Sequence, residues 1–152
     1  MSVASSTFAC SISDITPLVP CPQALGISRP SDFLYLHDNR LTSLPASLGR
    51  LKRLRYLNIS ENAVENLPEC VCGMQGLIEL RASNNPLATL PDSVQQLTAL
   101  RELHLRNTKV EYLPDAIAGL LQLRQIDLRW VDTLEPSVWF ADLEARGCVV
   151  YR

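Results

Sequence analysis

Residues 54–68 read LRYLNISENAVENLP and residues 77–91 read LIELRASNNPLATLP. The apolar residues, an asparagine and a Leu-Pro pair of the first segment therefore recur in the second at one constant spacing. The same 23-residue frame extends backward to Leu34 and forward to Leu128. A fixed period of this size is the signature of a solenoid, in which successive coils of the chain stack on one another. The repeat thus predicts the fold of most of the chain.

Each position of the repeat has a physical role. Leu57 and Ile59 alternate with polar residues, which is the pattern of a short strand with one buried face. Asn62 follows where the chain must turn out of the strand, and its amide can bond backbone groups that the turn leaves unpaired. We therefore expect Asn39, Asn62 and Asn85 to form an internal ladder.

The second half of the repeat returns the chain to its starting level. Leu67-Pro68 fixes an extended step, because proline lacks an N–H and disfavours a helical residue before it. The returning arms are too short for long helices, so short helical or 3₁₀ turns are expected. They are predicted at Ala46–Arg50, Glu69–Gly73, Asp92–Gln96 and Asp115–Gly119. Neither strand nor arm can bury its apolar side alone, so the coils must stack.

The repeat divides the chain into four parts. Five parallel strands are expected near Tyr35, Asn58, Arg81, His104 and Asp127, within repeats spanning residues 33–136. Residues 1–13 are expected to be a disordered Ser-rich leader. Residues 14–32 fit the frame poorly and predict a degenerate N-terminal cap or repeat, or the remnant of a longer array.

Residues 137–152 predict a C-terminal cap. A helix is expected from Ser137, with Gly147 just past its end, followed by a sixth strand. Val149 and Tyr151 lie one full repeat after Ile126 and Leu128, which predicts that this strand completes the sheet.

The spacing of Leu54, Leu57, Asn62 and Leu67-Pro68 resembles the leucine-rich repeat family, in the 23-residue Leu-Pro class of many bacterial and intracellular members. This resemblance implies an α/β solenoid, a right-handed superhelix with a concave parallel sheet and short convex arms. Partners of the family usually bind the concave face.

Composition excludes several classes of partner. The net charge of −2 and the pI near 5.6 give no bulk reason to expect nucleic acid or an anionic membrane. No apolar run approaches the roughly 20 residues that span a bilayer. The five cysteines have no metal-ligand spacing and form no C-terminal cluster, which favours reduced thiols and a cytoplasmic protein. The sequence leaves open whether Cys10 and Cys21 form a disulfide.

Catalytic motifs are absent from the sequence. It contains no P-loop, no Gly-rich dinucleotide turn, no metal triad and no nucleophile elbow, so we expect no enzyme activity, no cofactor and no metal. Cys70 occupies a small position of the returning arm and is interpreted as a packing residue. His104 beside Asp127 predicts a charge pair on the surface.

The concave face is the candidate binding site. Tyrosine, tryptophan and arginine are the residue types most often found as binding hot spots. The residues predicted to contact a protein or peptide are Tyr35, Tyr56, Arg81, His104, Arg106, Arg129 and Trp130. The other interpretation is a solvated ladder, whose ion pairs across strands are worth about 0.2 to 1 kcal/mol each.

Two functions follow from this site. The first is a non-enzymatic protein-protein recognition module. The alternative is the substrate-recognition part of a bacterial effector or of a ubiquitin-ligase or kinase-linked enzyme system. As an effector, the protein would be secreted into a host cell. The sequence leaves the partner and the oligomeric state open.

Overall fold

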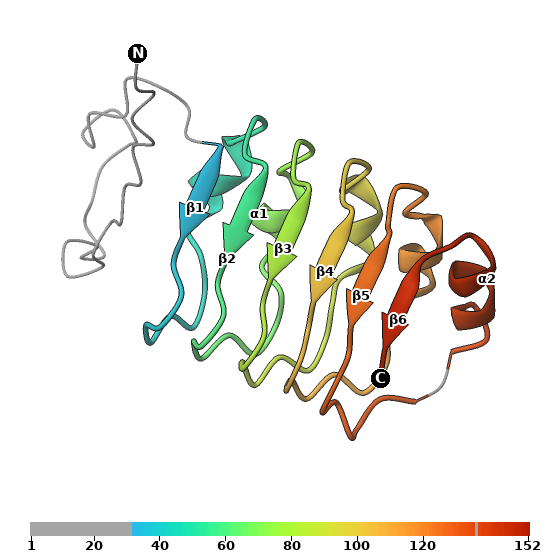
Figure 1. Ribbon diagram of the computed structural model, residues 1–152. Helices are drawn as coiled ribbons and strands as arrows, with labels where there is room; N and C mark the ends of the chain where they lie inside the picture. The colour runs from blue at the N-terminus through green and yellow to red at the C-terminus, as the bar shows by residue number, and fades with distance from the viewer. Residues whose placement is uncertain (1–31, 136) are drawn as a thin grey trace, which may run out of the picture.

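The computed structural model describes residues 32–135 and 137–152 and is an α/β solenoid (Figure 1). Its sheet has six parallel strands, each paired with the next in chain order. The strands are β1 (Phe33–Tyr35), β2 (Tyr56–Asn58), β3 (Glu79–Arg81), β4 (Glu102–His104), β5 (Gln125–Asp127) and β6 (Val149–Tyr151). The predicted leader, the N-terminal cap, Cys10 and Cys21 lie outside the described residues.

The returning arms are short, as predicted, and lie on the other side of the coils from the sheet (Figure 1). Three are 3₁₀ helices and one is a single α-helical turn: η3 (Ala46–Arg50), α1 (Glu69–Cys72), η4 (Asp92–Gln96) and η5 (Asp115–Gly119). Each begins after a proline in an extended conformation, which sets the direction of the arm. None of the described helices has the length and apolar character needed to cross a membrane.

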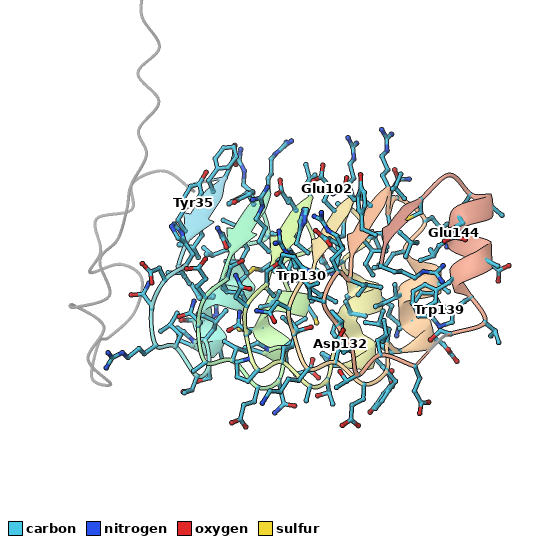
Figure 2. The ribbon with its side chains drawn as sticks, turned by 60° about the horizontal axis from the view of Figure 1, so that its bottom comes forward. Tyr35, Glu102, Trp130, Asp132, Trp139 and Glu144 are labelled. Carbon is cyan, nitrogen blue, oxygen red and sulfur yellow. The ribbon has the colours of Figure 1, made fainter. Side chains whose placement is uncertain are left out.

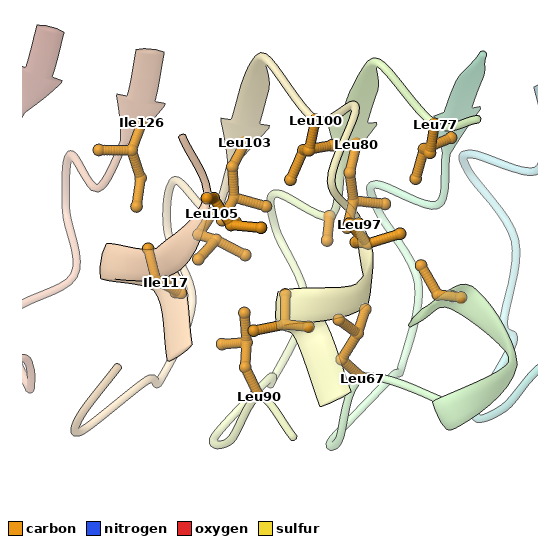
Figure 3. Close-up of a cluster of buried hydrophobic side chains, with 14 of the residues drawn as sticks. Leu67, Leu77, Leu80, Leu90, Leu97, Leu100, Leu103, Leu105, Ile117 and Ile126 are labelled. Atoms are coloured by element: carbon orange, nitrogen blue, oxygen red, sulfur yellow. The ribbon is translucent and has the colours of Figure 1, made fainter. Parts of the chain in front are cut away.

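The core lies between the sheet and the arms and is built from aligned columns (Figure 3). Leu57, Leu80, Leu103 and Ile126 are directly paired neighbours in the sheet, and all four are fully buried. Val94 and Ile117 close the opposite side from the arms. Stacking thus buries each leucine against the coils before and after it.

The asparagine ladder forms at Asn62 and Asn85. The Asn85 Oδ1 accepts a hydrogen bond from Val64 N at 3.1 Å, and its Nδ2 donates to Ile59 O and Ala82 O at 3.0 Å each. Asn62 makes the equivalent bonds one coil earlier, accepting from the backbone N–H of Leu41. Each amide therefore joins its own coil to the preceding one, so it satisfies buried backbone groups of both.

The C-terminal cap differs from the sequence-based expectation in its helix. Helix α2 spans Phe140–Ala145 and begins three residues later than predicted from Ser137. Phe140 and Leu143 are buried, whereas Val138 is 94% exposed. Val138 lies in the turn before the helix, so its side chain does not take part in the buried face of α2.

The register of β6 is also corrected. Ile126 pairs with Val150, so the offset between these strands is one residue longer than the repeat. A shift of one residue moves every side chain of a strand to the other face. Val149 and Tyr151 are therefore 49% and 41% exposed and do not occupy core positions. The turn at Gly147, with φ of 84°, leads from α2 into this strand and sets the new register.

The ladder predicts a large effect of Asn85→Ala. The substitution removes three buried hydrogen bonds and leaves Val64 N without its acceptor. We expect the free energy of unfolding to fall by about 2 to 4 kcal/mol in urea titrations. Asn66→Ala is the control: Asn66 is exposed and its side chain accepts one exposed hydrogen bond from Thr89 Oγ1 at 2.6 Å, so the loss should stay below about 1 kcal/mol. Equal losses in both variants would contradict the role of the ladder.

The close packing at Gly76 gives a second prediction for the free energy of unfolding. A Cβ at Gly76 would collide with the backbone carbonyl oxygen of Lys52 in the preceding coil, whereas a Cβ at Gly119 would meet nothing within 4 Å. We expect Gly76→Ala to cost about 1 to 3 kcal/mol through overpacking. Gly119→Ala should leave stability unchanged or raise it by up to about 1 kcal/mol. Thermal unfolding of the pair tests this difference, and a tolerated Gly76→Ala would refute it.

Candidate functional site

The outward side chains of the six strands form two columns, which we call the sheet face. The first column consists of Phe33, Tyr56, Glu79, Glu102, Gln125 and Val149. The second consists of Tyr35, Asn58, Arg81, His104, Asp127 and Tyr151. Alternation along each strand directs these residues away from the leucine core. The sheet face is the surface that the sequence predicts as the concave binding site.

Aromatic side chains gather at the N-terminal end of the sheet face. The ring of Tyr56 lies 5.0 Å from that of Tyr35 and 6.1 Å from that of Phe33, measured between centroids. The guanidinium carbon of Arg81 lies 5.8 Å from the Tyr56 ring centroid. Burial among these groups raises the pKa of Tyr56. Three predicted residues, Tyr35, Tyr56 and Arg81, are thus brought together, with Phe33 beside them.

Charged side chains occupy the middle of the sheet face. Arg81 Nε donates to Glu79 Oε1 at 2.6 Å. His104 Nε2 lies 3.4 Å from Glu102 Oε2 and 3.8 Å from Glu79 Oε1. The predicted pair of His104 with Asp127 is therefore wrong, because the closest carboxylates to His104 belong to its own strand and to β3.

Asp127 is bound by Arg129 instead. The two oxygens of the buried carboxylate accept from Arg129 Nε at 2.9 Å and from Nη2 at 2.7 Å, and Oδ1 also accepts from the Arg129 backbone N–H. Hydrogen bonding to Arg129 lowers the pKa of Asp127 despite its burial. Arg129 therefore neutralises a buried charge, and its guanidinium lies 5.2 Å from the Tyr151 ring.

Five residues at one edge of the sheet face have left-handed backbone, and they occupy the same position of successive repeats. They are Asp38, Glu61, Asn84, Asn107 and Trp130, with φ between 52° and 61°. Aspartate and asparagine tolerate this conformation better than bulky residues do. Trp130 is thus a conformational outlier in a position that its counterparts fill with polar residues. Its side chain, labelled in Figure 2, is 62% exposed. The guanidinium carbon of Arg106 lies over its ring, 3.6 Å from the centroid.

The predicted site residues therefore fall into separate groups. Tyr35, Tyr56 and Arg81 form one, Arg106 and Trp130 form another, and His104 and Arg129 are each engaged with carboxylates. Sequence reasoning missed Tyr151 because the 23-residue frame aligned it with Leu128, whereas in the sheet it pairs with Asp127. It also missed the juxtaposition of Glu79 and Glu102, although both occupy the same position of the repeat.

A second surface feature lies outside the sheet face. A hollow of about 530 Å³ is lined by Lys52, Arg53, Arg55, Arg101 and Asp32, among others. The recurrence of arginine at the repeat position of Arg55 and Arg101 was the signal for it in the sequence.

The described cysteines are Cys70, Cys72 and Cys148, and none forms a disulfide. Burial raises the pKa of all three thiols, which keeps them protonated at neutral pH. They are poorly suited to act as nucleophiles. This agrees with the interpretation of Cys70 as a packing residue.

Comparisons with known proteins agree with this architecture. A family model described as a leucine-rich repeat region matches residues 32–144. A leucine-rich repeat protein of Leptospira interrogans is similar in structure, with 26% identity and a TM-score of 0.61, over 79% of this chain and 36% of that one. The functional domain of InlJ from Listeria monocytogenes, which includes a cysteine ladder, is similar at 22% identity and a TM-score of 0.61, over 70% of this chain and 22% of that one.

The chain thus spans little more than a third of the first of these structures and less of the second. No curated protein sequence matches it. Since the family model covers residues 32–144, which is most of the length, the chain belongs to the leucine-rich repeat family.

Proposed function

We propose that the sheet face binds a protein or peptide partner and that the chain is a non-enzymatic recognition module. Membership of the leucine-rich repeat family supports a protein-interaction module in general. The extended surface of a solenoid suits this role, because it offers many side chains in a fixed arrangement. The proposed contact residues are Tyr35, Tyr56, Arg81, His104, Arg106, Arg129 and Trp130.

The observation that carries the proposal is the conformation of Trp130. A left-handed backbone costs an ordinary L-residue about 1 to 2 kcal/mol. An exposed tryptophan recovers little of this cost by burial, since 62% of Trp130 remains accessible. The left-handed turn recurs in every described repeat, so the distinctive feature is a large apolar residue at a position where the other four repeats carry Asp, Glu or Asn. Trp130 with Arg106 stacked on it therefore supports a binding contact at the C-terminal edge of the sheet face.

The Tyr35–Tyr56–Arg81 group supplies the second contact. Its rings are already packed against one another, so little side-chain freedom remains to be lost on binding. The first group lies on β1 to β3, whereas Arg106 and Trp130 follow β4 and β5, so the two groups occupy neighbouring parts of the sheet face. An extended segment that places apolar or acidic side chains against both groups fits this arrangement.

The alternative function places the same surface in an enzyme system. There the chain would select the substrate of a ligase or kinase, or act as a bacterial effector, and catalysis would reside on another domain or polypeptide. The bacterial origin of the similar Leptospira structure favours a bacterial setting. We propose a cytoplasmic location, which suits the free thiols. If the chain acts as a bacterial effector, we propose that it is secreted into a host cell.

Trp130→Asn separates binding from stability. It introduces the residue that Asn84 and Asn107 already provide at this position. Relief of strain offsets the lost Arg106 contact, which is worth about 0.5 to 1 kcal/mol, so the melting temperature should stay level or rise. The affinity for a partner captured by the wild-type chain should fall at least about 10-fold, as for a binding hot spot. A less stable variant with unchanged affinity would contradict the proposal.

The double substitution Tyr56→Ala with Arg106→Ala tests both groups of the sheet face at once. Capture of the partner should be lost, while the fold persists because neither side chain belongs to the leucine core.

The matched control is Tyr112→Ala with Arg50→Ala. It removes the same residue types from an exposed position outside the sheet face and from the end of η3. Partner capture, quantified by mass spectrometry, should match the wild type. Equal loss in both double variants, or in neither, would remove the sheet face from the proposal.

A further inference from the structure

We propose that Glu79, Glu102 and His104 form a binding site for a divalent transition-metal ion of the Zn²⁺ class. One carboxylate oxygen from each glutamate and one ring nitrogen of His104 all lie within 4.8 Å of one another. The site is built on β3 and β4, in the middle of the sheet face, where Glu102 is labelled in Figure 2. This inference does not rest on the proposed binding of a protein.

The strand register brings the ligands together. Glu79 pairs directly with Glu102, and Arg81 pairs with His104, so the two carboxylates lie side by side with the imidazole two residues along β4. Paired strands hold these positions at fixed spacing, unlike a mobile loop. The three donors therefore need only side-chain adjustments to converge.

The charge of this group favours a cation. Like charges directly opposite each other on neighbouring strands are destabilising. Glu79 and Glu102 are such a pair, and their side chains are 21% and 44% exposed. Arg81 compensates Glu79 through one hydrogen bond of 2.6 Å but forms no ion pair with Glu102 among the described residues. A divalent ion between the carboxylates would neutralise both.

The donor set and its spacing suit zinc. Neutral imidazole and carboxylate oxygens bind Zn²⁺ at about 2.0 to 2.2 Å, which places tetrahedral ligand atoms about 3.4 Å apart. His104 Nε2 is already 3.4 Å from Glu102 Oε2 and 3.8 Å from Glu79 Oε1. His104 is only 14% exposed, so its ring is held within the face. Three protein ligands leave a fourth position open for water or another donor.

The test is titration of the full chain with Zn²⁺ alone, observed by NMR of the imidazole nitrogens. The chain has two histidines, so His37 is an internal reference. We expect the signals of His104 to shift with one equivalent of metal while those of His37 stay in place. Co²⁺ should give a visible spectrum without thiolate charge-transfer bands, which distinguishes this site from the cysteines.

Substitutions assign the ligands. Even second-shell partners of a metal are worth about 10- to 100-fold in affinity, so His104→Asn should weaken binding at least about 100-fold. His37→Asn is the matched control and should leave the affinity unchanged. Metal binding that survives His104→Asn, or signals of His104 that ignore the metal, would overturn the site.

Arg81→Gln should change the metal affinity in the opposite direction. Arg81 competes for Glu79 Oε1, so its removal should tighten binding by about two- to fivefold, the factor that corresponds to an exposed ion pair. A purely structural cluster would gain nothing from this loss. Unchanged or weaker binding in Arg81→Gln would overturn the assignment of Glu79 as a ligand.

Discussion

The structure depends on the burial of leucines that no single coil can enclose. A three-residue strand and a short arm leave the apolar side of each coil open on both flanks, so every coil requires its neighbours. The leucine columns and the asparagine amides act together in this respect. The leucines supply contact area, and the amides satisfy the backbone groups that close packing removes from water. The array of side chains on the sheet face follows from this stacking.

Most of the fold could be predicted from sequence because the repeat is local and periodic. The five repeat strands and the bounds of η3, η4 and η5 follow from the 23-residue frame and the Leu-Pro steps. Prediction failed where the period stops. Between β5 and β6 the offset is one residue longer than the repeat. The path of the chain through the turn at Gly147 therefore determines whether Val149 and Tyr151 face the core or the solvent. The prediction for Val138 fails for the same reason, since apolar character alone does not determine whether a side chain points toward the core or toward solvent.

The candidate site shows a similar limit. The sequence identifies which residues face outward, because strand alternation fixes this, but not which of them pair. Asp127 has His104 beside it in the register, yet it bonds Arg129 two residues along its own chain segment, where a guanidinium can reach both oxygens. The left-handed conformation of Trp130 also has no signal in its residue type. Its alignment with Asn84 and Asn107 in the repeat was the available clue.

The asparagine ladder ends at Thr108, and this has a mechanical consequence. The Thr108 hydroxyl bonds Leu105 O within its own coil, whereas Asn62 and Asn85 reach back to the coil before. The junction of β3 with β4 therefore lacks the asparagine side-chain hydrogen bonds that link the coils at the two earlier junctions. The solenoid should therefore open more readily at this junction than at the junction of β2 with β3, which Asn85 bridges. Glu79 lies on β3, and Glu102 and His104 lie on β4, so a cation bound by all three would link the two coils at this junction.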